Sequence, residues 1–276
     1  MANLKFITDN RVNDNDNLTL ALGSTAAGHP LSNILTEKKV KTWRSTNTNA
    51  QQISISWPTT ETMGGFALAF TNLVSGNEFR IRAYDHPSAG SLIFDSGLVA
   101  LLYNQKNPAG FSTIGADSFS FGGGTYCSVF TTNMVNVRRV VVDISAGSNP
   151  DGYFEISRLI LGKSWSPEID PDFGASFKNN DNTTTLRTSA GDVSVNRGIQ
   201  FKSLQFTNSW LTFADTEGMA EALRVNGNHT PVFVSLLSNE TNFLYQAGQI
   251  YGRFTETSIA YSTYANLSAS IEILEV

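Results

Sequence analysis

The residues best suited to catalysis are scattered through the sequence. Three histidines, His29, His86 and His229, lie far apart and lack the spacing of a metal triad or of a helix-borne zinc motif. Asp85 precedes His86 and could orient its ring, but adjacent residues in a turn usually diverge and no activated-serine motif accompanies the pair. The single cysteine, Cys127, lies in an apolar strand pattern with no histidine near it in the sequence. We therefore predict a protein that is not an enzyme, without catalytic residues or cofactors.

Carboxylates are densest in the connector that contains Glu168, Asp170 and Asp172. Spaced by two in an extended chain, they project to one side, where they could hold a hard cation such as calcium if further donors completed the shell. Two convergent carboxylates are also what a glycan-cleaving enzyme requires. The alternative is a solvated linker. We predict no metal site, and these three residues are the candidates if one exists.

Binding residues are better represented than catalytic ones. Trp43 and Arg44 directly precede an alternating strand, and such a loop can offer an aromatic platform and a hydrogen-bonding guanidinium to a sugar. Tyr84 ends another alternating strand. We predict Trp43, Arg44 and Tyr84 as glycan-binding residues. The alternative for Trp43 is packing against the end of a sandwich core.

Length and composition limit the class of protein. The 276 residues suffice for two domains, and 41% hydrophobic with 16% charged residues is typical of an ordered globular protein. A net charge of −5 with scattered lysines and arginines gives no basic stripe for phosphates, which argues against nucleic acid as a partner. The start of the sequence lacks the apolar core of a signal peptide, and no apolar run approaches the ~18 residues of a membrane-spanning helix. We therefore expect no membrane insertion and folding in a cytosol.

Most ordered segments alternate apolar and polar residues with a period of two, which predicts an all-β protein. In residues 52–57 and 78–84 the alternation places one face in a core and the other in water. Two prolines and two glycines interrupt the pattern over residues 162–174. We predict a β-sandwich over residues 1–165 and a small β-barrel over residues 166–276.

One segment has helical periodicity. Met219, Ala222 and Leu223 recur at helical spacing between Thr216, which could cap the N-terminus, and Gly227. We predict a single helix over residues 216–226 that covers the open side of the barrel. The C-terminal run from residue 268 to residue 276 alternates again and is a candidate edge or closing strand.

Three segments of the first half resemble a known family: Trp43-Arg-Ser-Thr46, Glu78-Phe-Arg-Ile-Arg82 and the closing run from Phe154 to Gly162. Together they resemble the galactose-binding-like (discoidin-type) jelly roll as it occurs in bacteriophage virion proteins. The resemblance implies a jelly-roll β-sandwich, and family members often bind glycans.

The second half is similar to the barrel-and-belt domain of phage distal tail or baseplate proteins. The segments that carry this similarity are Arg197 to Phe201, the helix, Pro231 to Val234, and the ending from Tyr251 to Val276. It implies a structural subunit of a tail tip, assembled in the bacterial cytoplasm, that forms a homo-oligomeric ring around the tail tube. Its expected partners are other tail and baseplate proteins, including fibres or receptor-binding proteins. The alternative function is a carbohydrate-binding module that recognises a host surface glycan.

Overall fold

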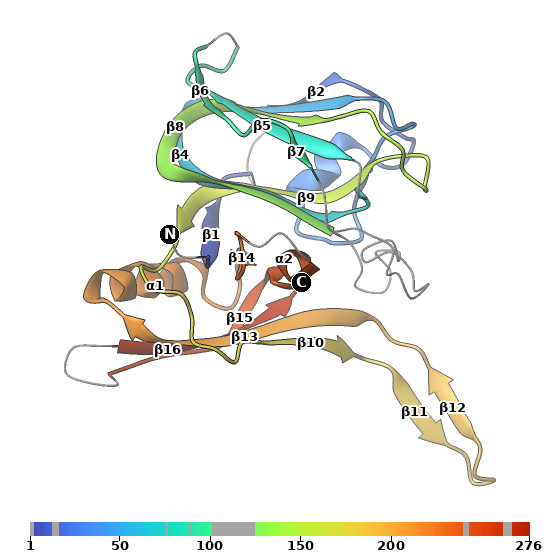
Figure 1. Ribbon diagram of the computed structural model, residues 1–276. Coiled ribbons are helices and arrows are strands. Elements are labelled where there is room, and N and C mark those ends of the chain that lie inside the picture. The colour runs from blue at the N-terminus through green and yellow to red at the C-terminus, as the bar shows by residue number, and fades with distance from the viewer. Residues whose placement is uncertain are drawn as a thin grey trace.

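The computed structural model describes residues 3–12, 17–74, 77–88, 90–100, 125–239, 243–261 and 267–276. The described chain is mostly β structure and forms two stacked parts, a jelly-roll sandwich and a second sheet with two helices (Figure 1). The jelly roll comprises β2 (Leu18–Leu22), the 3-10 helix η1 (Leu31–Leu35), β3 (Trp43–Arg44), β4 (Gln51–Thr71), β5 (Glu78–Tyr84), β6 (Leu92–Asp95), β7 (Val99–Ala100), β8 (Thr125–Ile144) and β9 (Glu155–Trp165). The all-β prediction with an N-terminal jelly roll is confirmed.

Two long strands, β4 and β8, build both layers of the sandwich. The two strands pair with each other along most of their length, with register shifts between the paired segments. In addition, β4 pairs with β2 near its start and with β9 near its end. Bends of this kind let one strand pass from one sheet to the facing sheet. The alternation in residues 52–57 and 78–84 puts the expected faces inward, including Ile53 and Ile81. The core between the layers therefore follows directly from the period of two.

The second part is the antiparallel run β10-β13-β16-β15-β14-β1, which continues through β9 into the strands of the jelly roll as one sheet. Its strands are β1 (Lys5–Asn10), β10 (Ser176–Asp181), β13 (Gln200–Leu211), β14 (Val232–Ser235), β15 (Gln249–Tyr261) and β16 (Leu267–Glu275). We call it the second sheet. Helix α1 (Phe213–Asn226) packs against β1 and β13, and the short helix α2 (Phe243–Ala247) precedes β15. A separate two-stranded sheet, β11 (Thr184–Arg187) with β12 (Val193–Asn196), extends away from the body (Figure 1).

The N-terminal strand β1 joins the two parts. It pairs with β14 on one side and with the end of β9 on the other, and Phe6 lies in the core of the second sheet. The division at residues 165 and 166 stays a prediction, but β1 belongs by packing to the second sheet. No local pattern could show this, because the partner of Lys5 is Ser235.

Aromatic side chains fill the space between the two parts. Phe70, Tyr126, Phe233 and Tyr251 are buried in one cluster that draws on strands of both the jelly roll and the second sheet. Phe70 has a positive φ of 55°, an unusual conformation for a bulky residue, at a register shift of β4. This shift coincides with the point where the Phe70 ring meets Tyr126, 5.5 Å between centroids.

Three sequence-based expectations about the second part need correction. Helix α1 begins at Phe213, three residues before the predicted start, because Thr212 and Asp215 form a capping box. The helix is not single, since α2 is present. The C-terminal run is not an edge, because β16 lies between β13 and β15 and pairs with both. Within the described residues, we find no helix that is both long and apolar enough to span a membrane.

Candidate functional site

Trp43 does not form a sugar platform. Its side chain is fully buried in the jelly-roll core, and its indole Nε1 donates a hydrogen bond of 3.2 Å to Thr25 Oγ1. The alternation of β3 explains this, because Trp43 faces inward where Arg44 faces outward. Trp43 therefore packs against the end of the sandwich, and the prediction that it contacts a ligand does not fit the structure.

Tyr84 lies far from Arg44. It ends β5, where it pairs with Arg139. The other end of β5 lies on the Arg44 side, because Asn77 bonds Ser148, and the neighbouring Asn149 bonds Asn72, which accepts the N–H of Glu155. Seven strand residues span about 20 Å. The guanidinium carbon of Arg139 lies 4.3 Å from the centroid of the Tyr84 ring. The structure therefore does not bring together the three residues predicted to bind glycan, and only Arg44 remains at a candidate site.

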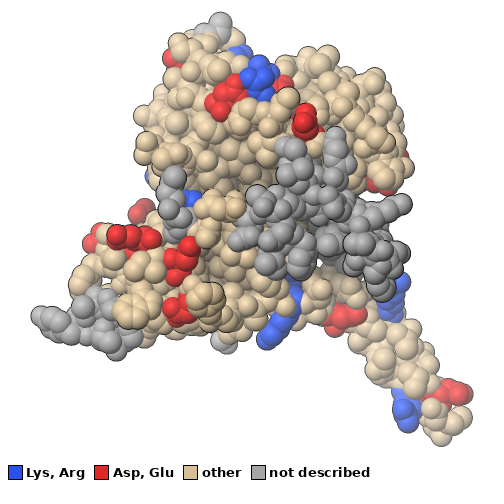
Figure 2. Space-filling model, viewed as in Figure 1, with Lys and Arg blue, Asp and Glu red and all other residues tan. Residues whose placement is uncertain are grey.

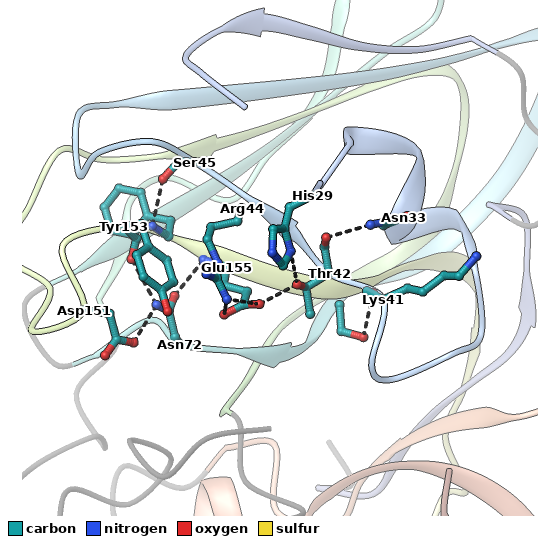
Figure 3. A network of polar contacts seen from close by, with 12 residues as sticks. His29, Asn33, Lys41, Thr42, Arg44, Ser45, Asn72, Asp151, Tyr153 and Glu155 are labelled. Carbon is teal, nitrogen blue, oxygen red and sulfur yellow. Dashed lines mark hydrogen bonds and ion pairs between the residues drawn. The ribbon is translucent and has the colours of Figure 1, made fainter. Parts of the chain in front are cut away.

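Arg44 is the centre of a polar cluster at one end of the jelly roll, shown in Figure 3. Its guanidinium Nη2 donates to both carboxylate oxygens of Glu155, at 3.2 and 3.3 Å. The same guanidinium lies over the ring of Tyr153, 4.2 Å from its centroid. Glu155 is buried, whereas Arg44 and Tyr153 are partly exposed. We call Arg44, Tyr153 and Glu155, together with Thr42 and His29, the Arg44 cluster.

Thr42, which is buried, links Glu155 to the partly exposed His29. The Thr42 hydroxyl donates to Glu155 Oε1, and Thr42 Oγ1 lies 3.0 Å from Nδ1 of His29. Because the single hydroxyl hydrogen of Thr42 is used on Glu155, His29 Nδ1 must carry the hydrogen of the second contact. The buried carboxylate thus sets the hydrogen-bonding role of the histidine.

Asn72 fixes the loop that carries Tyr153. Its amide nitrogen donates to Asp151 Oδ2 at 2.9 Å and to the Tyr153 carbonyl at 3.0 Å. Its amide oxygen accepts the backbone N–H of Glu155 at 2.7 Å. Asn72 is buried, so these contacts are shielded from water. The backbone that carries Tyr153 is therefore fixed by Asn72, and burial raises the pKa of the Tyr153 hydroxyl above the ordinary value.

The arrangement suits the recognition of a neutral, hydroxyl-rich ligand. Planar groups such as guanidinium and carboxylate make paired hydrogen bonds to neighbouring hydroxyls, and an aromatic ring packs against the C–H face of a sugar. The cluster contains one basic side chain, Arg44, and one acidic side chain, Glu155, in direct contact. Their charges offset each other, which disfavours binding of a strongly charged ligand.

The three carboxylates of the connector do not converge. Asp170 accepts backbone N–H groups of Asn3 and Leu4, at 2.5 and 3.1 Å, and so ties the connector to the N-terminal strand. Asp172 accepts a hydrogen bond from the Ser209 hydroxyl, and Glu168 is exposed. Among the residues that the structure describes, no three His, Cys, Asp or Glu side chains are placed to hold a metal ion. The connector geometry thus supports neither a calcium site nor a pair of catalytic carboxylates.

The remaining candidates for chemistry are also separated. Asp85 Oδ1 accepts the backbone N–H of Ser91 at 2.7 Å, while His86 Nδ1 lies 3.3 Å from the backbone nitrogen of Ser88. Asp85 therefore does not orient the His86 ring. Cys127 is buried, and burial raises the pKa of its thiol to about 12.

Sequence reasoning missed Glu155 and Tyr153. Both lie at the start of the closing strand, where the apolar run from Phe154 onward predicts only packing. A charged residue in a run that is buried on both faces must have a partner, and Glu155 and Arg158 were the available signals. The partner itself, Arg44, lies 111 positions away in the sequence.

Comparison with known proteins finds similar solved structures at low sequence identity. No family model and no curated protein sequence matches it. Similar solved structures include the family 32 carbohydrate-binding module of Clostridium perfringens NanJ in complex with galactose, at 12% identity and a TM-score of 0.37, covering 58% of this chain and 99% of that one. The lectin domain of lectinolysin complexed with Lewis B antigen has 13% identity and a TM-score of 0.39, covering 57% and 98%. A structure of reduced XRCC1 bound to the DNA polymerase β catalytic domain has a TM-score of 0.38 and 11% identity, and the match covers 54% of this chain and 97% of that one. Similarity at this level does not assign a function.

Proposed function

We propose that this protein is a non-catalytic binding protein whose jelly roll recognises a glycan through the Arg44 cluster. The proposal rests on the stacking of the Arg44 guanidinium on the Tyr153 ring. Both side chains are partly exposed, and the buried carboxylate of Glu155 accepts a hydrogen bond from Arg44. Buried polar partners keep the two exposed groups in one orientation, which lowers the entropic cost of binding. A host surface glycan is the ligand that the sequence resemblance implies.

The test uses two matched tyrosines. Tyr153 and Tyr84 are both partly exposed and both lie beneath an arginine, at 4.2 and 4.3 Å from ring centroid to guanidinium carbon, but at opposite ends of the jelly roll. Binding of the purified protein to an array of immobilised glycans identifies the ligand. Tyr153→Ala should then weaken affinity at least tenfold, while Tyr84→Ala should leave it unchanged. Wild-type protein that bound no glycan, or equal affinity in both variants, would remove the proposal.

A second candidate function is assembly, as a subunit of a larger particle. The hairpin β11–β12 favours it, because every residue of its two strands is exposed and isolated two-stranded hairpins are marginally stable in water. The finer proposal, a homo-oligomeric phage tail-tip or baseplate subunit in the virion, connected to fibres or receptor-binding proteins, rests on the sequence resemblance.

Sedimentation of the purified protein over a wide concentration range tests assembly. A subunit that pairs with its own copies should shift from monomer to a defined oligomer as concentration rises. A monomer at every concentration would contradict self-assembly. Detection of the protein in purified phage particles tests the virion proposal separately.

A further inference from the structure

The hairpin β11–β12 carries exposed apolar side chains, Leu186, Val193 and Val195, that no described part of the chain covers. It continues β10 and β13 beyond the body of the protein, and it points away from both the jelly roll and α1 (Figure 1). Val193 and Val195 are 55% and 59% exposed. A β-hairpin that exposes such side chains is a candidate for pairing with another surface.

One face of the hairpin combines apolar and basic groups. Residues paired across antiparallel strands point to the same face, and Arg187 pairs with Val193 while Thr185 pairs with Val195. Val193, Val195 and Arg187 therefore share one face, which we call the arm face. Ser194 and its partner Leu186, which is 70% exposed, point to the opposite face, which lacks an arginine.

A complementary surface lies at the other end of β13. A bulge in β13 between Asn208 and Leu211 accompanies the exposure of Trp210, which is 54% exposed, and Phe213 at the start of α1 is 62% exposed. Glu217 follows Phe213 by four residues, so both lie on one exposed face of α1. We call Trp210, Phe213 and Glu217 the helix patch.

The arm face and the helix patch match in chemistry but cannot meet within one molecule. The twelve residues of β13 separate them, a span of about 36 Å at the usual rise per strand residue. Figure 2 shows acidic side chains gathered over α1, at the end of the molecule opposite the hairpin. Apolar groups flanked by Arg187 on one surface thus match apolar groups flanked by Glu217 on the other. A second copy of the chain supplies each surface with its complement.

We propose that the arm face of one molecule binds the helix patch of a second copy, with Arg187 next to Glu217. The contact joins two different surfaces, so it is heterologous and repeats from copy to copy into a ring or an open filament. This inference rests on the proposed assembly function and names its partner and its docking surface.

Disulfide formation between two copies that carry different cysteine substitutions tests the contact. Val195→Cys and Phe213→Cys are made as separate proteins, with the buried Cys127 left in place. Under mild oxidation a disulfide-linked dimer should form when the two proteins are mixed, and Val195→Cys alone should form none. Ser194→Cys mixed with Phe213→Cys is the matched control and should crosslink at least tenfold less.

The outcomes separate this inference from the assembly function itself. Crosslinking of Val195→Cys alone would show symmetric arm-to-arm pairing and overturn the proposal. A protein that sediments as an oligomer but forms no mixed crosslink would overturn the docking surface and leave assembly standing. A monomer at all concentrations would overturn both.

Charge reversal gives an independent readout. Arg187→Glu should weaken oligomer formation at least tenfold at low salt, because it places two carboxylates together. Mixing Arg187→Glu with Glu217→Arg should restore the contact between the two proteins. Failure of this rescue, with both variants folded, would contradict the pairing of Arg187 with Glu217.

Discussion

The hydroxyl of Tyr126 donates a hydrogen bond of 2.6 Å to Oε1 of Glu275, which joins strand β8 of the jelly roll to strand β16 of the second sheet. Lys39 lies 3.4 Å from Oε2 of the same carboxylate, and the backbone N–H of Lys202 donates to it at 3.0 Å. Burial lowers the pKa of both lysines and, with the neighbouring Glu275, raises that of Tyr126 well above its ordinary value. Glu275 therefore connects the two parts of the molecule through a shielded set of charges.

Removing the Tyr126 hydroxyl should loosen this connection. Tyr126→Phe leaves a buried carboxylate oxygen without its donor, which costs about 1 to 3 kcal/mol of unfolding free energy. Denaturant unfolding followed by tryptophan fluorescence measures the change. The control Tyr84→Phe alters a partly exposed hydroxyl and should stay within about 0.5 kcal/mol of wild type. Equal stability of the two variants would show that the contact contributes nothing.

Capping of α1 depends on Thr212 and not on Thr216. Thr212 Oγ1 accepts the backbone N–H of Asp215, whereas the Thr216 hydroxyl donates to the Thr212 carbonyl inside the helix. Thr212→Ala should lower stability by about 1 kcal/mol, within the usual range for a lost N-cap. Thr216→Ala is the matched control, with a smaller expected loss. Thermal unfolding of both variants decides the question, and the reverse order of stability would place the cap at Thr216.

The thiol of Cys127 should be unreactive in the folded protein. Its pKa is raised to about 12 by burial, so the thiolate is scarce at neutral pH and the sulfur is not accessible. A thiol-specific chromogenic reagent at pH 8 should label it only after denaturant is added. Because the folded pKa lies above the unfolded value of 9.0, its contribution to stability is complete below pH 9 and is lost as pH rises toward 12. Rapid labelling of native protein would refute the buried assignment.

The ion pair between Arg80 and Asp95 should make a small, pH-dependent contribution. The Arg80 hydrogen bonds lower the pKa of Asp95 from 3.8 to about 2. The folded value is depressed, so the stabilisation is present above pH 3.8 and disappears as pH falls to about 2. Unfolding midpoints of Asp95→Asn and wild type should therefore differ at pH 6 and converge near pH 2. A difference that persisted at pH 2 would assign the effect to something other than ionisation.

Local patterns in the sequence predicted the strands well and the long-range pairings poorly. Ile53 and Ile81 face the core because alternation along a strand is a local property. The start of α1 was placed three residues late, because Thr212 and Thr216 both fit an N-cap and the capping-box partner is Asp215 instead of the usual glutamate or glutamine. The five-residue helix α2 was not predicted, since so short a segment shows no helical period.

The candidate site was only partly predictable for the same reason. Arg44 stood out because its neighbours in sequence suggested a binding loop. Glu155 and Tyr153 come from a distant strand, and only the pairing of β3 with β9 brings Glu155 opposite Arg44. Tyr84 was grouped with Arg44 by residue type, and sequence alone could not show that β5 carries it to the opposite end.

The pairing of Lys5 with Ser235 sets an order of events during synthesis of the chain. While the ribosome is still adding residues beyond β9, the jelly roll already contains all of its own strands and can fold. Strand β1 then has β9 as its only available neighbour, and its other edge stays open until β14 emerges. Contacts so distant in sequence form slowly, and open edges are where nascent chains associate wrongly. One edge of β1 therefore stays unpaired during synthesis of all the residues between β9 and β14.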